Sequence, residues 1–184
     1  MRSAALTPTS PRELKRTVYA SLMPALMAAG AYIAVPIGPV PIVLQNLFVL
    51  LAGLLLGPRW GLASVGVYLL LGACGLPVFA GGTGGIGRLA GPTGGYLLGY
   101  LPAVYLVGTI AKKTPAGLLG DILALATGVL AVYALGVPWL KMVTGMPWPK
   151  ALAVGLYPFL IGDGIKVAAA IPAARLLRPL MGRI

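Results

Sequence analysis

The chain has no histidine, a single cysteine (Cys74) and only three acidic residues among its 184 residues. One cysteine excludes an internal disulfide and any metal site built from several cysteines. Without histidine, and with so few carboxylates, the sequence lacks the usual ligands of a transition metal and the commonest general base of enzymes. We therefore expect no metal, no cofactor and no catalytic residue.

Charge is scarce as well, at 9% of residues, whereas 59% are hydrophobic and the mean hydropathy is +0.95. Soluble domains carry about 25% charged residues, so this composition indicates an integral protein of the lipid bilayer. The net charge of +11 raises nucleic acid as an alternative partner. However, the basic residues stand singly or in pairs beside apolar spans, without an interleaved aromatic patch, so we expect no nucleic-acid binding.

Apolar runs predict an all-α membrane protein with six transmembrane helices, because about 20 apolar residues cross a bilayer. The expected spans are 17–35, 42–57, 60–76, 96–111, 118–137 and 151–177. The last of these is long enough to tilt or to hold an interruption. A tight turn is expected at 36–41 and a loop at 136–150. We expect a cytoplasmic tail, residues 1–16, and a single membrane domain, residues 17–184.

The first span has two interpretations. Ala29-Gly30-Ala31 resembles a signal-peptide cleavage site behind a basic segment. Alternatively, Ser21, Ala25 and Ala29 are four residues apart and form a stripe of small side chains, which is typical of helices that pack closely in membranes. We expect this stripe to dock a partner subunit.

The basic residues also predict the orientation of the spans. The tail, Arg59, the pair Lys112-Lys113 and the C-terminal arginines place ten of them on one side, against three on the other side, with Lys166 inside a span. By the positive-inside rule, both termini are cytoplasmic and the loop between the third and fourth spans is extracytoplasmic.

That loop, within the stretch 81–96 (GGTGGIGRLAGPTGGY), is too rich in glycine for a lipid-facing helix. Gly82, Gly84 and Gly87 match a dinucleotide-binding pattern, but the strand, helix and distant acid that this pattern requires are missing. Irregular backbone at membrane depth must be covered by protein or line a cavity. We expect its free N–H groups to bind an anion or a carbonyl. For Gly95 and Gly99, close helix packing is the alternative.

The sixth span contains an acid and a base three residues apart, Asp163 and Lys166, which share one face of a helix. One interpretation is an ion pair that only locks helix packing. The other is a ligand site, because an acceptor beside a donor in a dry pocket suits a planar urea, lactam or pyrimidine. Arg88 and the glycine-loop amides would then suit a ligand carboxylate.

Three other polar residues have a mainly structural interpretation. Gln45 and Asn46 carry amides, which in membranes usually form hydrogen bonds between helices, although ligand contact is the alternative. Asp121 stands about one turn into the fifth span, where the helix dipole favours an anion. We expect it to be an interfacial or structural acid.

The order of motifs along the chain resembles the BioY family, the biotin-binding S components of energy-coupling factor (ECF) transporters. The resemblance covers about residues 17–178 and rests on Pro39-Val40-Pro41-Ile42 with Gln45, Leu50-Leu51-Ala52-Gly53, Gly75-Leu76-Pro77-Val78-Phe79, Gly81-Gly82 with Gly84-Gly85, Gly91-Pro92-Thr93-Gly94-Gly95-Tyr96, and Gly162-Asp163 with Lys166. It implies six helices, an outward-open biotin site, and contact of Asp163 and Lys166 with the head of biotin. It also implies a transmembrane coupling subunit and two ATPases as partners, because the chain has no G-x-x-x-x-G-K-[ST] motif of its own.

The predicted substrate-binding residues are Asp163, Lys166, Gly82, Gly84, Gly85, Arg88, Tyr96 and Gln45. Two alternatives stay open: an S component for thiamine or riboflavin, and an intramembrane enzyme or assembly protein that uses Asp163 and Lys166 as acid and base. Against the second stand the missing histidine and the lack of a third polar group or a nucleophile beside the pair.

Overall fold

The computed structural model describes residues 11–36, 38–115 and 117–181, and most of them are helical. The helices are α1 (Pro11–Tyr32), α2 (Gln45–Ala73), α3 (Ile86–Ala90), α4 (Gly94–Lys113), α5 (Leu118–Thr144), α6 (Trp148–Gly155) and α7 (Tyr157–Met181). A short antiparallel hairpin of β1 (Ala34–Val35) and β2 (Ile42–Val43) joins α1 to α2 at the expected turn. The predicted tail is described only from Pro11 on, where α1 begins, and residues 1–10 lie outside the described part.

Within the described residues, four helical segments are long and apolar enough to cross a membrane, namely Gln45–Ala73, Gly94–Lys113, Leu118–Thr144 and Trp148–Pro179. Large apolar side chains on them face outward, among them Leu70, Leu130 and Ile161, which are 65%, 67% and 79% exposed. Such surfaces are stable only against lipid or another protein. The chain is therefore a multi-pass helical membrane protein.

Helix α2 covers two of the expected spans, 42–57 and 60–76. It is broken at Gly57, which divides it into a first arm before the break and a second arm after it. This residue has φ 75° and ψ −175°, a conformation that glycine adopts without strain, and Pro58 follows it without an N–H to donate. A Cβ on Gly108 of α4 would lie 2.4 Å from the Pro58 nitrogen, so α4 packs directly on the break. The expected start at Ile42 is wrong, since Ile42 pairs with Val35 in the hairpin.

The loop expected at 136–150 is also wrong, because α5 continues to Thr144 through Pro138. Packing against α4 explains the extension. The indole N–H of Trp139 donates to the carbonyl of Gly91 at 2.9 Å, and a Cβ on Gly95 would lie 2.2 Å from the Trp139 Cβ. The close-packing interpretation of Gly95 is confirmed, and Gly99 likewise lies against Val132.

The sixth expected span is interrupted at Leu156, between α6 and α7. Tyr96 stabilises this break, since its hydroxyl donates to the carbonyl of Gly155 at 2.8 Å. In α1, Gly30 packs against the ring of Phe48, where a Cβ would lie 2.8 Å from it. This contact favours the packing interpretation of Ala29-Gly30-Ala31, because the helix continues through it to Tyr32.

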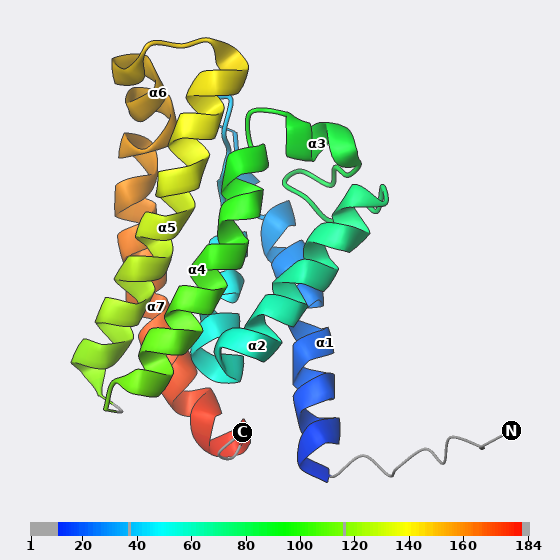
Figure 1. The fold of residues 1–184 in the computed structure, drawn as a ribbon, viewed down its shortest axis with the longest axis vertical. Helices are drawn as coiled ribbons and strands as arrows, with labels where there is room; N and C mark the ends of the chain where they lie inside the picture. Colours follow the sequence, from blue (N-terminus) through cyan, green and yellow to red (C-terminus); the bar gives the residue numbers. More distant parts are fainter. Residues whose placement is uncertain (1–10, 37, 116, 182–184) are drawn as a thin grey trace, which may run out of the picture.

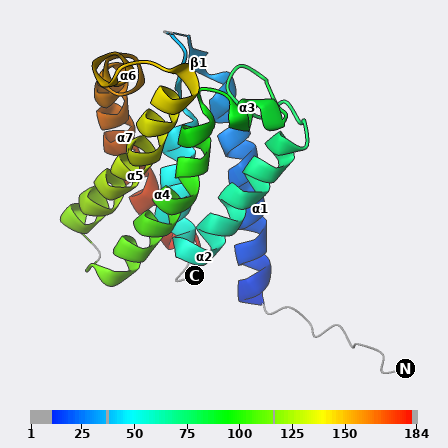
Figure 2. The same cartoon turned by 45° about the horizontal axis from the view of Figure 1, so that its top comes forward.

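The hairpin, α3 and α6 gather at one end of the molecule, which Figure 2 brings forward. The described ends of α1 and α7 lie at the opposite end, together with the turn between α4 and α5 and the break in α2 (Figure 1). The glycine-rich stretch links α2 to α4 at the hairpin end. This arrangement surrounds a cavity near that end.

Candidate functional site

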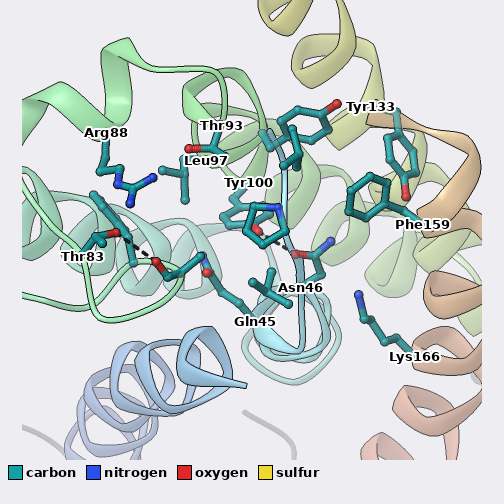
Figure 3. A pocket seen from close by; sticks show the side chains of 16 residues that line it. Gln45, Asn46, Thr83, Arg88, Thr93, Leu97, Tyr100, Tyr133, Phe159 and Lys166 are labelled. Atoms are coloured by element: carbon teal, nitrogen blue, oxygen red, sulfur yellow. Dashed lines mark hydrogen bonds between the residues drawn. The ribbon is translucent and has the colours of Figure 1, made fainter. Parts of the chain in front are cut away.

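The cavity lies among the hairpin, the glycine-rich stretch and helices α2, α4, α5 and α7. Its wall is formed mainly by apolar and aromatic side chains, with polar groups at two sides (Figure 3). The lining residues are Val40, Pro41, Val43, Gln45, Asn46, Phe79, Ala80, Thr83, Arg88, Thr93, Tyr96, Leu97, Tyr100, Tyr133, Phe159 and Lys166. Apolar walls with a few placed polar groups are typical of small-molecule sites.

On one side of the cavity, Lys166 belongs to a buried network with Asp163 and Tyr133. The Lys166 ammonium donates to Oδ1 of Asp163 at 2.8 Å, and the Tyr133 hydroxyl donates to Oδ2 of the same carboxylate. Asp163 and Lys166 are 5% and 7% exposed. Because a buried charge is stable only when it is paired, Asp163 acts as the counter-ion of Lys166 at the cavity wall.

Asp163 itself stands behind Lys166. It lines a smaller neighbouring cavity together with Asn46 and Tyr100. The flanking glycines leave space, since a Cβ on Gly164 would meet no atom within 4 Å and one on Gly162 would meet only Ile42 at 3.9 Å.

Two further residues of this side are joined to each other. The Tyr100 hydroxyl donates to Oδ1 of Asn46 at 2.6 Å, between α4 and the start of α2. In Figure 3 the amide nitrogen of Asn46 and the ammonium of Lys166 both lie on the side of Phe159. The helix-to-helix hydrogen bond expected of Asn46 is therefore confirmed, and Asn46 lines the cavity as well.

The other side of the cavity holds Arg88 from α3, Thr83 from the preceding loop, and Gln45. Gln45 is 1% exposed, and its Nε2 has no hydrogen-bond partner within the described part of the chain. A buried unsatisfied donor costs about 1–3 kcal/mol. Its presence on a cavity wall indicates a partner that enters from the cavity.

The glycines of the loop shape this side without lining it. The N–H groups of Gly81, Gly82 and Gly85 donate to the carbonyls of Ala31, Phe79 and Gly72, respectively. These amides are therefore already bonded within the protein.

The same glycines are required by backbone shape and space. Gly82 and Gly85 have φ 70° and 92°, which favour glycine. A Cβ on Gly84 would lie 2.2 Å from the Leu76 carbonyl oxygen. Turns and close backbone approach thus account for Gly82, Gly84 and Gly85.

Of the eight predicted binding residues, the structure brings four to the cavity wall: Gln45, Arg88, Tyr96 and Lys166. The Tyr96 hydroxyl is bonded to the carbonyl of Gly155, so Tyr96 lines the cavity with its ring. This ring lies edge-on to the ring of Tyr133. Sequence reasoning missed Tyr100 and Tyr133 as site residues. A tyrosine within an apolar span was the signal that could have found them, because a buried tyrosine hydroxyl usually has a hydrogen-bond partner.

The small-residue stripe of α1 lies away from this cavity. Ser21, Ala25 and Ala29 are all exposed, on the face opposite the buried Met23 and Met27. Ser21 and Ala25 also line a separate groove between α1 and the second arm of α2.

Fold and site together define a helical membrane protein with a buried, two-sided pocket for a small solute. Comparison with known proteins identifies the family. The chain belongs to the BioY family, whose model matches residues 2–183.

Named relatives include biotin transporters of Thermotoga maritima, 42% identical over 167 residues (89% of this chain, 96% of the relative), and of Lactococcus lactis, 38% identical over 178 residues (92% and 94%). The crystal structure of an S component for biotin from an ECF-type ABC transporter superposes with a TM-score of 0.86 at 35% identity, covering 94% of this chain and 95% of that one.

Proposed function

We propose that this chain binds biotin and takes it up as the substrate-binding S component of an ECF transporter. The observation that carries the proposal is a cavity with an apolar wall between two polar sides, one with Lys166 and Asn46, the other with Arg88 and Gln45. Biotin has a cyclic urea at one end, an apolar middle and a carboxylate at the other end. The relatives named as biotin transporters support the same ligand.

In the proposed arrangement, Lys166 donates to the ureido oxygen. Asp163 does not line the cavity and contributes from behind Lys166, as the counter-ion that positions its ammonium. Arg88 and the unpartnered amide of Gln45 hold the carboxylate. Gly82, Gly84 and Gly85 contribute by shaping the loop that carries Arg88.

We also propose six membrane crossings, by α1, the two arms of α2, α4, α5 and α7, with residues 17–184 as one domain. Both termini and the 1–16 tail are then cytoplasmic and the glycine-rich loop is extracytoplasmic. Support comes from Figure 1, in which the described ends of α1 and α7 lie at the same end as the α4–α5 turn with Lys112 and Lys113. Basic residues gather on the cytoplasmic side of membrane proteins.

The proposed partners are a transmembrane coupling subunit and the ATPase subunits of an ECF transporter. The chain has no phosphate-binding P-loop motif, so any ATP hydrolysis that drives transport belongs to another subunit. The named relatives are transporters, which favours transport over the enzyme alternative.

The binding prediction is tested by calorimetry on the purified protein. We expect biotin to bind without nucleotide at nanomolar affinity, about −12 kcal/mol, because the ligand is enclosed and both of its polar ends are matched. Thiamine and riboflavin are the control ligands. A clear isotherm with one of them, and none with biotin on folded protein, would replace the proposed substrate.

The docking prediction concerns the exposed stripe on α1. Ala25→Trp is expected to abolish assembly with the coupling subunit, because small residues are what allow two helices to approach closely in lipid. Biotin affinity should stay unchanged, since Ala25 does not line the cavity. Co-purification with the coupling subunit and calorimetry are the two measurements. Assembly without biotin binding would show that this face serves the pocket instead.

A further inference from the structure

We propose that Asn46 is a further ligand-contacting residue, and that Tyr100 fixes its amide so that the pocket accepts a cyclic urea and rejects a cyclic guanidine. This inference rests on the proposed function, because it concerns how the same cavity recognises the ureido end of biotin. The key observation is the direction of the hydrogen bond between Tyr100 and Asn46.

The Tyr100 hydroxyl donates to Oδ1 of Asn46 at 2.6 Å. A side-chain amide has one acceptor oxygen and an NH2 group with two donors. Because the oxygen is held by Tyr100, the NH2 group is the part of Asn46 that remains for the cavity. Tyr100 is 3% exposed and packs in the core, so its hydroxyl is fixed in place.

Lys166, like Asn46, presents hydrogen-bond donors to the cavity. Its ammonium has only donors, and its nearest acceptor is Asp163, which stands behind it. Figure 3 shows the nitrogen of Asn46 and that of Lys166 on the same side of the cavity. Tyr133 donates to the other carboxylate oxygen of Asp163 and so uses a second acceptor of this network. The cavity wall here therefore offers N–H groups to an acceptor atom.

The oxygen of a cyclic urea is such an acceptor. In 2-iminobiotin, the same position carries a nitrogen with N–H groups, and the guanidine is protonated at neutral pH. The two ligands have nearly the same shape and share the ring N–H groups. They differ at the one atom that Asn46 and Lys166 would contact. At this atom the N–H groups of iminobiotin would face the N–H donors of both residues, and its positive charge would face that of Lys166.

The test is the ratio of affinities for biotin and 2-iminobiotin, measured by calorimetry at neutral pH on the full chain. The wild-type protein should prefer biotin by about 100-fold or more, because a site built to hydrogen-bond one group rejects an analogue that leaves its polar atoms unpaired. Equal binding of the two ligands would overturn the inference and leave biotin binding intact. Failure to bind biotin at all would instead remove the proposed function.

Asn46→Asp converts the donor into an acceptor without changing the shape of the side chain. We expect this change to lower the affinity for biotin by about 10- to 100-fold and to make the protein prefer iminobiotin over biotin. Gln45→Glu is the matched control, because it makes the same chemical change in the adjacent residue on the Arg88 side of the cavity. It should weaken both ligands together and leave the ratio unchanged.

Tyr100→Phe tests the positioning role. It removes the hydroxyl and frees the Asn46 amide to turn, so the preference for biotin should fall about tenfold. If Asn46→Asp does not fold, Asn46→Ala takes its place, and its preference for biotin over iminobiotin is expected to fall about tenfold, as in Tyr100→Phe. A ratio that stays at the wild-type value in Tyr100→Phe and in the Asn46 variant would show that neither residue selects the ligand.

Discussion

Asp163→Asn is expected to weaken biotin binding by about 2–5 kcal/mol, or roughly 30- to 5000-fold. Asparagine keeps the shape of the side chain but removes its charge. Lys166, which is 7% exposed and donates to Asp163 at 2.8 Å, would then be a buried cation without a counter-ion. The Tyr133 hydroxyl would also lose its charged acceptor. Both donors would lose the charged acceptor that holds them in position.

The control for this variant is Arg88→Ala on the other side of the cavity. Arg88 is exposed, so its interaction with a carboxylate is screened by water, and its loss is expected to cost less, about 1 kcal/mol or below. Comparing biotin with biotin amide separates the two sides. Asp163→Asn should weaken both ligands equally, whereas Arg88→Ala should affect the amide little.

A reversed pattern would contradict the proposed orientation of biotin. If Asp163→Asn acted only on the carboxylate ligand, and Arg88→Ala acted equally on both, the ureido ring would have to lie against α3. Unchanged affinity in Asp163→Asn would remove Asp163 from the site, and the ion pair with Lys166 would then only stabilise the packing of α7.

The features that the sequence predicted well are those that depend on neighbouring residues. The pairing of Asp163 with Lys166 follows from a spacing of three on one helix, which brings the side chains together whatever surrounds them. The apolar spans follow from the cost of placing polar residues in lipid. The break at Gly57-Pro58 was likewise visible as a boundary between two spans.

Other features depend on distant partners and could not be predicted. Tyr133 lies 30 positions from Asp163, and Tyr100 lies 54 positions from Asn46, and no local pattern relates either pair. The sequence predicts an earlier end of α5, because Pro138 is a common helix breaker, whereas in the structure Trp139 packs against Gly95 on α4 and the helix continues to Thr144.

The glycine-rich stretch shows how one composition serves two purposes. Free amides for an anion and tight turns against other backbone both require glycine. The difference lies in where the N–H groups point, and those of Gly82 and Gly85 donate to carbonyls of the protein. Only the three-dimensional structure separates these cases, so the anion-binding role passes to Arg88 and Gln45 in the proposed site.

The largest effect on stability is expected at Asp121, the acid that the sequence assigned to structure instead of ligand binding. Asp121 is 3% exposed, and Arg178 donates to both of its oxygens, at 2.6 and 3.0 Å. This pair ties the start of α5 to the end of α7. Asp121→Ala would leave Arg178, whose side chain is 31% exposed, without its acceptor, and losing the charged hydrogen bonds of this partly buried pair is expected to cost about 1.5–3 kcal/mol.

Thermal unfolding of the purified protein, with and without biotin, measures this effect. Asp121→Ala should lower the unfolding temperature markedly while the protein that is still folded at low temperature binds biotin with unchanged affinity, since Asp121 does not line the cavity. Arg175→Ala is the matched control: its Nε lies 3.8 Å from Asp121 and its side chain is 48% exposed, so it should cost less than about 1 kcal/mol. Weaker biotin binding with an unchanged unfolding temperature in Asp121→Ala would instead make Asp121 part of the binding machinery.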